Sequence, residues 1–519
     1  MAIKIDPRPP AFSSGWQEFA IIAIVCVTQL LNQAGATQGL ALMNSLDSTF
    51  PNVTSTDKLW FMAAFPLTAG AFILISGKFG DLYGLKRVMM CGILWSILWC
   101  LMSGLSGYTH SVIFFCICRA LHGVGVAYVF PTAVGIIGSM YPVGQRKAFV
   151  FSLVGAMAPT GGLVGAVFTG LTAEKGHWQW AFYANAIVFA ILGVAAWYLL
   201  PNVPRHAPPE AKMDWIGSTI GVAALILINV ATNQAAEAGW DSPYVLVLFI
   251  VGILLFVCFL YIEKRVEWPL IPKEVMNIHI GLILLIVGLG WAAFSVYLYY
   301  YWSMSMNLKG WSPALVGATY VTLALSGTAA AFSVGALISR VHPSIMLFIA
   351  TLAFLAGILM LSQTPLHQTY FCMLLIQQII IPFGMDITFP AASLVLSDHL
   401  PKRHQGMASS LVSTMTNYGL SASLGFAATA EVKVFAHTGD LLKSYHAAMY
   451  VGVGIAGLGC VLGVVLILIS LFRPPHWDDT ESTAEINLQS INIETGLAGK
   501  KPPVQDGAEG TSIEPHEQT

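Results

Sequence analysis

The chain has 519 residues, of which 56% are hydrophobic and only 10% are charged, with a formal net charge of −2 and a mean hydropathy of +0.72. A water-soluble fold of this length cannot bury so much apolar surface, so the composition excludes a soluble protein and indicates a membrane protein. The apolar runs are continuous rather than alternating, which excludes a transmembrane β-barrel.

The apolar runs are about 20 residues long, enough to cross roughly 30 Å of hydrocarbon as α-helices. We therefore expect an all-α integral membrane protein with fourteen transmembrane helices. They are expected at 18–43, 60–76, 88–107, 111–137, 148–172, 181–201, 215–233, 243–262, 278–302, 313–338, 344–362, 369–397, 405–430 and 446–472.

The leader, residues 1–17, is polar and carries Lys4 and Arg8 without an early small-residue cleavage site. We expect it to stay in the cytoplasm and not to act as a signal peptide. With fourteen spans and both termini inside, most of the 24 Lys and Arg residues fall in cytoplasmic segments, as the positive-inside rule requires.

The first external loop contains the sequon N-V-T, which makes Asn52 the expected glycosylation site. All eight cysteines fall inside expected spans, where a free thiol acts as a small apolar group. We expect neither a disulfide nor a metal site.

The stretch GKFGDLYGLKR, residues 77–87, joins the second and third spans on the cytoplasmic side. Its glycines permit a tight turn, its aspartate can face a helix N-terminus, and its basic pair can hold the loop at the inner surface. These residues are Gly77, Gly80, Gly84, Asp81, Lys86 and Arg87.

An internal repeat relates FPTAVGIIGSMYP, residues 130–142, to FPAASLVLSDHLP, residues 389–401, at an offset of 259 positions. The same offset places Gly125 on Gly384. Two halves of six spans each are the architecture of secondary transporters that rock around a central site. Chance similarity between apolar segments is the alternative, and the constant spacing argues against it.

Six spans with their loops need about 200 residues, so the offset leaves roughly 60 residues unexplained. The two spans at 215–233 and 243–262 fill this gap as an inserted pair. We expect a leader at 1–17, a six-helix bundle at 18–201, a linker with two extra helices at 202–277, a second six-helix bundle at 278–472 and a disordered cytoplasmic tail at 473–519.

The 77–87 stretch resembles the G-x-L-x-D-x-x-G-x-(R/K)-(R/K) loop of the major facilitator superfamily, where that loop acts as a latch between the halves. Leu82 and Leu85 stand where the family often has basic residues. The resemblance therefore implies that Asp81 is the principal latch residue.

CRALHGVGVAYVFP, in the span at 111–137, resembles the family's R-x-x-x-G-x-G motif and contains Arg119. A cation at membrane depth costs about 2.5 to 3.5 kcal/mol, so it normally faces a partner or a water-filled cavity. We expect Arg119 to act in proton coupling or substrate binding, with a structural hydrogen bond to carbonyl groups as the alternative. His122, one turn away, is either a proton relay or a packing residue.

GAMAPTGGLVGAVFTG, in the span at 148–172, resembles the antiporter motif G-P-x-x-G, with Ala158 where that motif has glycine. The spacing leaves one helical face nearly bare, so a neighbouring helix can approach closely. By the resemblance, the motif favours export. Its residues here are Gly155, Pro159 and Gly162.

Two further stretches are similar to the fourteen-helix drug:proton antiporter branch of this family: WQWAFYAN and MDITFPAASLVLSDHLPKRHQGMASSLVSTMTNYG. Within it they resemble the fungal group of aminotriazole-resistance, borate-efflux and low-affinity ammonium transporters. The aspartate that many members carry in the first span is absent, and Asn32, Gln33 and Gln38 supply polarity instead.

Asp386 is the carboxylate expected to carry the proton. It lies near the middle of the span at 369–397, close to Pro382 and Pro390, which free backbone carbonyls at that depth. The alternative is a permanent pair with Gln378 or Tyr418.

The span at 278–302 contains the aromatic stretch YLYYYW. This stretch and its surroundings could line a cavity for amphipathic ligands or form an interfacial aromatic belt. Polar side chains of other spans could face the same cavity. The substrate-cavity candidates are Asn32, Gln33, Gln38, Trp291, Tyr297, Gln378, Asn417 and Tyr418.

A phosphate-binding G-x-x-x-x-G-K-S/T loop is absent from the sequence, so we expect an ion gradient, and not ATP, to drive the protein. We expect a monomeric transporter and not an enzyme, without cofactor or nucleic acid, whose partners are a small-molecule substrate, protons and the lipid bilayer.

The most favoured function is proton-coupled efflux of small toxic or secondary-metabolite compounds across the plasma membrane by alternating access, with the vacuolar membrane as the alternative location. Two other functions stay open. One is a facilitator or uptake carrier for a small polar nutrient such as ammonium. The other is a non-transporting nutrient sensor, whose output would need the tail from residue 474 onward.

Overall fold

The computed structural model describes residue 9 and residues 12–141, 145–203, 210–271, 276–337, 341–398 and 405–472. Within these ranges the chain forms fourteen α-helices and no strand. Contacts group residues 1–468 into one compact unit and residues 469–519 into another. The tail expected at 473–519 lies outside the described residues.

The helices are α1 (Gly15–Ala41), α2 (Ser55–Tyr83), α3 (Leu85–Leu105), α4 (Val112–Met140), α5 (Gln145–Glu174), α6 (Trp180–Leu199), α7 (Trp215–Ala238), α8 (Pro243–Glu263), α9 (Ile278–Ser303), α10 (Pro313–Leu337), α11 (Pro343–Ser362), α12 (Met373–Asp398), α13 (Gln405–Thr438) and α14 (Leu441–Phe472).

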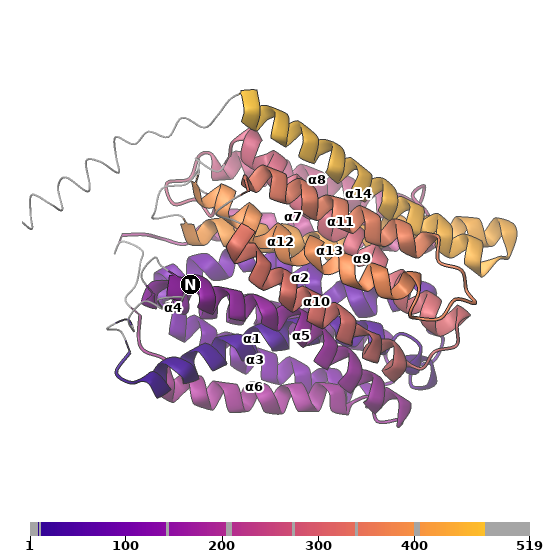
Figure 1. Ribbon diagram of the computed structural model, residues 1–519, viewed down its shortest axis with the longest axis horizontal. Helices are drawn as coiled ribbons and strands as arrows, with labels where there is room; N and C mark the ends of the chain where they lie inside the picture. Colours follow the sequence, from indigo (N-terminus) through magenta and orange to yellow (C-terminus); the bar gives the residue numbers. More distant parts are fainter. Residues whose placement is uncertain are drawn as a thin grey trace, which may run out of the picture. The chain divides into compact units, whose positions relative to one another are not determined.

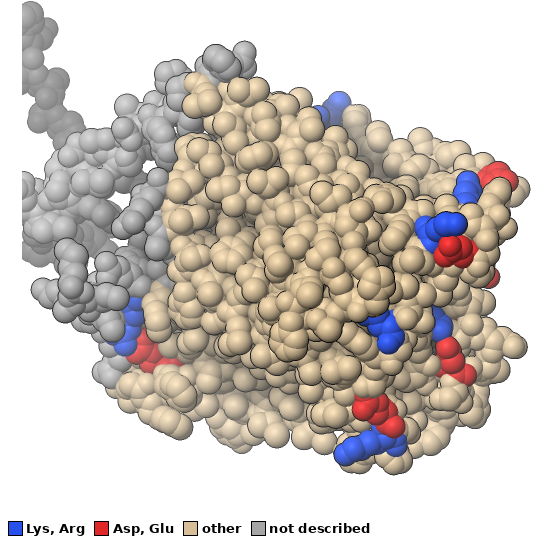
Figure 2. All heavy atoms as spheres, turned by 45° about the vertical axis from the view of Figure 1, so that its right-hand side comes forward, with Lys and Arg blue, Asp and Glu red and all other residues tan. Residues whose placement is uncertain are grey.

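Thirteen of these helices are long and apolar enough to cross a membrane, judged by length and composition. The other one, α13, carries Ser413, Thr414, Thr416 and Asn417 in its first half. On the face shown in Figure 2, charged side chains gather toward the two ends and leave an uncharged band between them. Each expected span overlaps one helix, so the fourteen-helix membrane fold is confirmed.

Helix α2 is longer at both ends than the span expected at 60–76. At its start Thr54 Oγ1 accepts from the Asp57 amide at 3.1 Å and Asp57 Oδ2 accepts from the Thr54 amide at 2.8 Å, a capping box. At its end only Gly84, at a φ of 96°, separates α2 from α3. Residues 77–83, expected in a loop, are therefore the last turns of α2.

Two sets of helices pack within themselves. In the first, α1 packs on α5, α2 and α3 pack on α4, and α6 packs on α3; in the second, α11 and α10 pack on α12, and α13 packs on α9. The two sets meet where α5 contacts α10 and α2 contacts α13. In Figure 1, α1, α3 and α6 lie on one side, α11 and α12 on the other, and α2, α5 and α10 between them.

Glycines bring the backbones together at these two contacts. A Cβ atom on Gly170 of α5 would lie 2.7 Å from the backbone nitrogen of Ala314 in α10. A Cβ atom on Gly70 of α2 would lie 3.0 Å from the backbone nitrogen of Tyr418 in α13. Any larger residue would separate these helices, so small residues set the spacing between the two sets.

The inserted helices α7 and α8 pack on each other, and α7 also contacts α2 and α13. The attachment is polar: Ser421 Oγ lies 2.9 Å from both the Ala63 carbonyl oxygen of α2 and Asn229 Oδ1 of α7. The Tyr418 hydroxyl donates to the Leu225 carbonyl oxygen at 3.3 Å. The inserted pair is thus held against the α2–α13 contact by buried hydrogen bonds.

Candidate functional site

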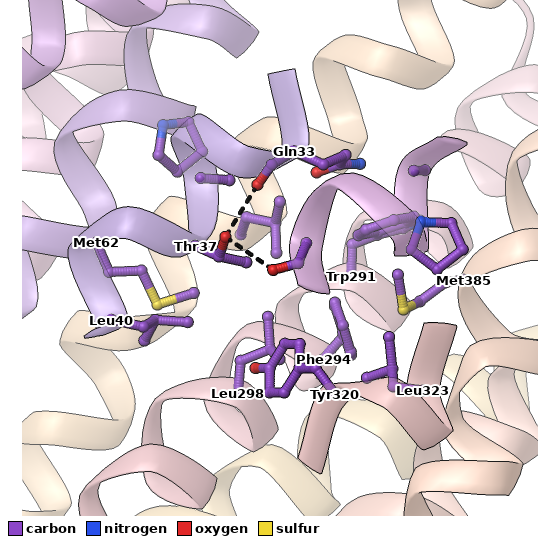
Figure 3. A pocket seen from close by; sticks show the side chains of 16 residues that line it. Gln33, Thr37, Leu40, Met62, Trp291, Phe294, Leu298, Tyr320, Leu323 and Met385 are labelled. Atoms are coloured by element: carbon purple, nitrogen blue, oxygen red, sulfur yellow. Dashed lines mark hydrogen bonds between the residues drawn. The ribbon is translucent and has the colours of Figure 1, made fainter. Parts of the chain in front are cut away.

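A small cavity lies where the two sets of helices meet (Figure 3). It has a volume of about 50 Å³, and its sixteen lining residues come from α1, α2 and α5 on one side and from α9, α10, α12 and α13 on the other. The lining residues are Gln33, Ala36, Thr37, Leu40, Met62, Pro66, Ala158, Pro159, Gly162, Trp291, Phe294, Leu298, Tyr320, Leu323, Met385 and Leu420.

The cavity wall is mostly apolar and aromatic, and no charged side chain lines it within the described part of the chain. Its polar groups come from Gln33, Thr37, Trp291 and Tyr320. The Thr37 hydroxyl contacts the Gly162 carbonyl oxygen at 3.2 Å, and the Tyr320 hydroxyl accepts from the Trp302 indole nitrogen at 2.8 Å. Among these groups in the described structure, the Trp291 indole nitrogen is buried without a partner, so it is a donor free to bind a ligand.

A volume of about 50 Å³ holds one or two water molecules and is too small for an organic ligand. Beyond the C-terminal end of α1, the two sets are joined by Asn44 Nδ2 donating to Asn307 Oδ1 at 2.6 Å. On the same side, the Ala314 amide of α10 donates to Glu174 Oε1 of α5 at 2.9 Å. The two sets are therefore held together at this end of the bundle, and an organic ligand can enter from this side only after they move apart.

Arg119 is fully buried one layer behind the cavity wall. One of its terminal nitrogens donates to the Gly35 carbonyl oxygen of α1 at 2.7 Å, and the guanidinium lies 5.1 Å from the Phe65 ring centroid and 5.8 Å from that of Phe182. Its other two nitrogens have no hydrogen-bond partner, and no carboxylate forms an ion pair with it among the described residues. The cation is held by one carbonyl group and two aromatic faces.

His122 lies beside Arg119 in the same dry layer. Its Nε2 atom is 3.3 Å from Cys100 Sγ, its Nδ1 atom is buried without a partner, and its ring meets Phe65 edge-on at 5.1 Å between centroids. Neither His122 nor Arg119 lines the cavity. The surroundings of His122 are those of a packing residue more than those of a proton relay, since no titratable oxygen contacts it in the described structure.

Asp386 adjoins the cavity, next to the lining residue Met385 on α12. Its Oδ2 atom is buried and has no hydrogen-bond partner among the described residues, so the expected alternative of a pair with Gln378 or Tyr418 is not formed. A Cβ atom on Gly327 of α10 would lie 2.9 Å from this oxygen. The carboxyl group therefore rests on the bare backbone of α10.

The antiporter-motif residues of α5 face α10 and α1. Pro159 lines the cavity, and its Cβ atom would also lie 2.9 Å from a Cβ atom on Gly327. Gly162 lines the cavity and accepts from Thr37, whereas a Cβ atom on Gly155 would meet Ala331 of α10 at 4.0 Å. The structure thus places Pro159 and Asp386 against the same glycine, Gly327.

Of the eight expected cavity residues, Gln33 and Trp291 line the cavity and six do not. Two of the six are tied to backbone: Gln38 Nε2 donates to the Ala181 carbonyl oxygen at 3.0 Å, and Asn417 Nδ2 donates to the Ser413 carbonyl oxygen at 3.0 Å. The six are Asn32, Gln38, Tyr297, Gln378, Asn417 and Tyr418.

Tyr297 is the clearest case of an aromatic residue that turns away from the cavity. It is fully buried, its ring stacks on Phe294 with centroids 6.2 Å apart, and its hydroxyl has no partner among the residues that the structure describes. Phe294, three residues earlier, lines the cavity instead. Helix rotation therefore decides which ring of this aromatic stretch reaches the site.

The expected latch residues lie at the end of α2 and the start of α3. Lys86 Nζ donates to the carbonyl oxygens of Trp197 at 2.8 Å and Leu200 at 2.5 Å, so it caps the end of α6. Gly77 faces Ser410 of α13, where a Cβ atom would meet Oγ at 3.3 Å. Asp81 is partly buried and Arg87 is exposed.

An ion pair that the sequence reasoning missed joins α1 to α5. Arg146 donates to both carboxylate oxygens of Glu18, at 2.8 and 2.6 Å, and the Tyr141 hydroxyl donates to Glu18 Oε1 at 2.6 Å. The hydrogen bond to Glu18 raises the pKa of Arg146. Burial has the largest effect on Tyr141 and raises its pKa, and the hydrogen bond to the same carboxylate raises it further. A buried Glu near the start of the first span was the available signal, because such charges need partners.

Asn52, the expected glycosylation site, lies in an exposed turn before α2 and adopts a φ of 56°. The turn would leave its side-chain amide accessible.

Comparison with known proteins shows which family the chain matches. The family model described as the Major Facilitator Superfamily matches residues 12–262, 213–426 and 280–502. The Aminotriazole resistance protein of Saccharomyces cerevisiae is 42% identical over 90% of this chain and 87% of its own length. The Low affinity ammonium transporter of the same yeast is 38% identical over 88% of each chain. Efflux pump terJ of Aspergillus terreus is 36% identical over 89% of this chain and 90% of its own length.

Among solved structures, a peptide transporter POT in complex with sulfate superposes with a TM-score of 0.61 at 16% identity, covering 87% of this chain and 94% of that chain. At this identity the likeness concerns the fold alone.

Proposed function

The chain belongs to the Major Facilitator Superfamily and is a multi-pass membrane transporter, and from that premise we propose that it exports small toxic or secondary-metabolite compounds in exchange for protons. We further propose that it works as a monomer in the plasma membrane. The observation that carries the proposal is the contact of Asp386 with Gly327, beside the central cavity and against Pro159 of the antiporter motif.

Alternating access follows from where the cavity lies. Its walls come from two sets of helices that touch mainly through α5–α10 and α2–α13, so a rocking motion of one set against the other opens the cavity to one side at a time. The external hydrogen bond between Asn44 and Asn307 is one contact that must break when the cavity opens outward.

Asp386 is suited to couple this motion to proton movement. A carboxylate whose Oδ2 lies without a partner among the described residues, against an apolar glycine–proline contact, is costly when charged, so this conformation favours the neutral carboxylic acid. Opening toward water hydrates the group and lets the proton leave. One proton moving down about 100 mV and one pH unit supplies roughly 3.7 kcal/mol, enough to concentrate a neutral solute several hundredfold.

The cavity lining favours uncharged, partly aromatic compounds. Trp291 and Phe294 offer flat apolar surfaces, and the free indole nitrogen of Trp291 offers one hydrogen bond. Aminotriazole, the compound after which a 42% identical relative is named, is a small heterocycle of this kind and serves as the first test compound.

The test uses purified protein in proteoliposomes loaded with labelled aminotriazole. An imposed pH gradient, acidic on the side toward which the compound leaves, should accelerate efflux, and a proton ionophore should remove the acceleration. Efflux that ignores the gradient would disprove proton coupling.

Ammonium uptake is the second candidate, because a relative that is 38% identical is a low-affinity ammonium transporter. Aromatic faces such as Trp291 can hold a small cation, although no carboxylate lines the cavity within the described residues. Growth of an ammonium-uptake-deficient yeast on limiting ammonium, with and without this chain, separates uptake from export.

A further inference from the structure

Two acidic side chains meet at the cytoplasmic end of the inserted helix pair. Asp214 caps the start of α7, where its Oδ1 accepts from the Gly217 amide at 2.9 Å. Glu263 is the last residue of α8, and its Oε2 accepts from the Ile271 amide at 2.9 Å. One oxygen of each carboxyl group is thus engaged with backbone.

The second oxygen of each group has no partner. Asp214 Oδ2 and Glu263 Oε1 are both buried and make no hydrogen bond among the described residues, and Glu263 as a whole is 0% exposed. Both oxygens lie near Gly217: a Cβ atom there would clash with Asp214 Oδ2 and lie 3.1 Å from Glu263 Oε1. The two free oxygens therefore border the same small space beside Gly217.

The described cations near this space form no ion pair with either carboxyl group, although the charge of Lys78 acts on both. Lys78 of α2 donates to the Pro269 carbonyl oxygen at 3.3 Å and forms no ion pair with Asp214 or Glu263 in the described structure. Arg265 directs its guanidinium over the Tyr261 ring, 5.2 Å from the centroid, and Lys264 is exposed. Asp81 of α2 adds a further negative charge close to Lys78.

We propose that Glu263 holds a proton and donates it toward Asp214, forming a proton-binding site at the junction of α7 and α8 that is separate from Asp386. With both groups ionised, two buried oxygens beside Gly217 would be charged without an ion-pair partner among the described residues, which is costly. With one proton bound, the protonated carboxyl donates to the other and satisfies both free oxygens.

The site connects the inserted pair to the expected latch. The segment that follows Glu263 supplies both the amide that Glu263 accepts, at Ile271, and the carbonyl group that Lys78 contacts, at Pro269. Loss of the proton as the cytoplasm becomes alkaline places two like charges at this junction and loosens the segment from the end of α2. The inserted pair thus carries a proton whose release acts on the latch helix.

Infrared difference spectroscopy of the full-length protein in lipid nanodiscs tests the proposal directly. When the buffer is stepped from mildly acidic to mildly alkaline, the parent protein should lose a carboxylic-acid C=O band as the proton held by Glu263 leaves. In Glu263→Gln that band should be absent, and in Asp214→Asn it should be absent or displaced.

Both substitutions preserve the local structure, because Gln keeps an oxygen for the Ile271 amide and Asn caps helices as well as Asp does. Two controls complete the design. Glu237→Gln, at an exposed position near the other end of α7, should leave the band unchanged. Asp386→Asn should also leave it unchanged, so failure of the proposed transport role of Asp386 and failure of this site are distinguishable. A band that persists unaltered in both Glu263→Gln and Asp214→Asn would overturn the proposal.

Discussion

Asp386 and Pro159 stand on helices far apart in the chain, yet both rest on Gly327: a Cβ atom on that glycine would lie 2.9 Å from Asp386 Oδ2 and 2.9 Å from Pro159 Cβ. A titratable group, the antiporter-motif proline and the α5–α10 contact therefore share one point. A change in the charge of the carboxyl group would therefore act directly on the α5–α10 contact.

Asp386→Asn should abolish uphill transport while leaving exchange of substrate across the membrane. The amide mimics the neutral acid in shape and cannot release a proton, so the cycle loses its coupling but not its binding site. Proteoliposomes with and without a pH gradient measure both activities. Uphill transport at the parental rate would remove Asp386 from the coupling mechanism.

Gly327→Ala should slow transport strongly and lower stability, because the added methyl group enters a space already in contact with Asp386 and Pro159. Overpacking of this kind costs about 1 to 3 kcal/mol. Gly454→Ala is the matched control, since a Cβ atom there meets no atom within 4 Å. Thermal unfolding and aminotriazole efflux of the two variants are compared; equal behaviour would contradict the close contact.

Arg119→Met should abolish transport without a large loss of stability. The single hydrogen bond to Gly35 is lost, but so is the cost of a buried cation without a carboxylate, and the free energy of unfolding should change by less than about 1 kcal/mol. Thermal unfolding in detergent and efflux in proteoliposomes measure the two effects. A collapse of stability with proportionate loss of activity would assign Arg119 a purely structural role.

Trp291→Ala should weaken aminotriazole binding roughly threefold to tenfold, since an aromatic contact contributes about 0.5 to 1.5 kcal/mol beyond its buried area. Tyr297→Phe is the matched control on the same helix: it deletes a hydroxyl that has no partner and does not line the cavity. The concentration dependence of efflux gives the apparent affinity. Equal KM values for the two variants and the parent would place the binding site elsewhere.

Arg146→Met should destabilise the protein by about 3 kcal/mol, because it leaves the buried carboxylate of Glu18 without its cation. The double variant Glu18→Gln/Arg146→Met removes both charges and should recover much of that loss. A double-mutant cycle on thermal unfolding measures the coupling. Additive effects would show that the pair does not act as a unit.

Much of the fold could be predicted from single stretches of sequence, but the site could not. Apolar runs located all fourteen helices, while the latch residues 77–83 were expected in a loop and are helical, because Gly84 alone makes the turn. Of these two expected cavity residues, Trp291 lines the cavity and Tyr297 does not, although both stand on the same aromatic helix.

The reason lies in the range of the forces. The free energy of transferring a helix into hydrocarbon is a sum over consecutive residues. Length and hydropathy by themselves therefore determined that this chain is a bundle of membrane-spanning helices. Which face of each helix meets a partner depends on packing between residues hundreds of positions apart. Only the tertiary structure decided that Asp386 rests on Gly327, that Arg119 contacts Gly35 in place of a carboxylate, and that Glu263 and Asp214 both lie beside Gly217.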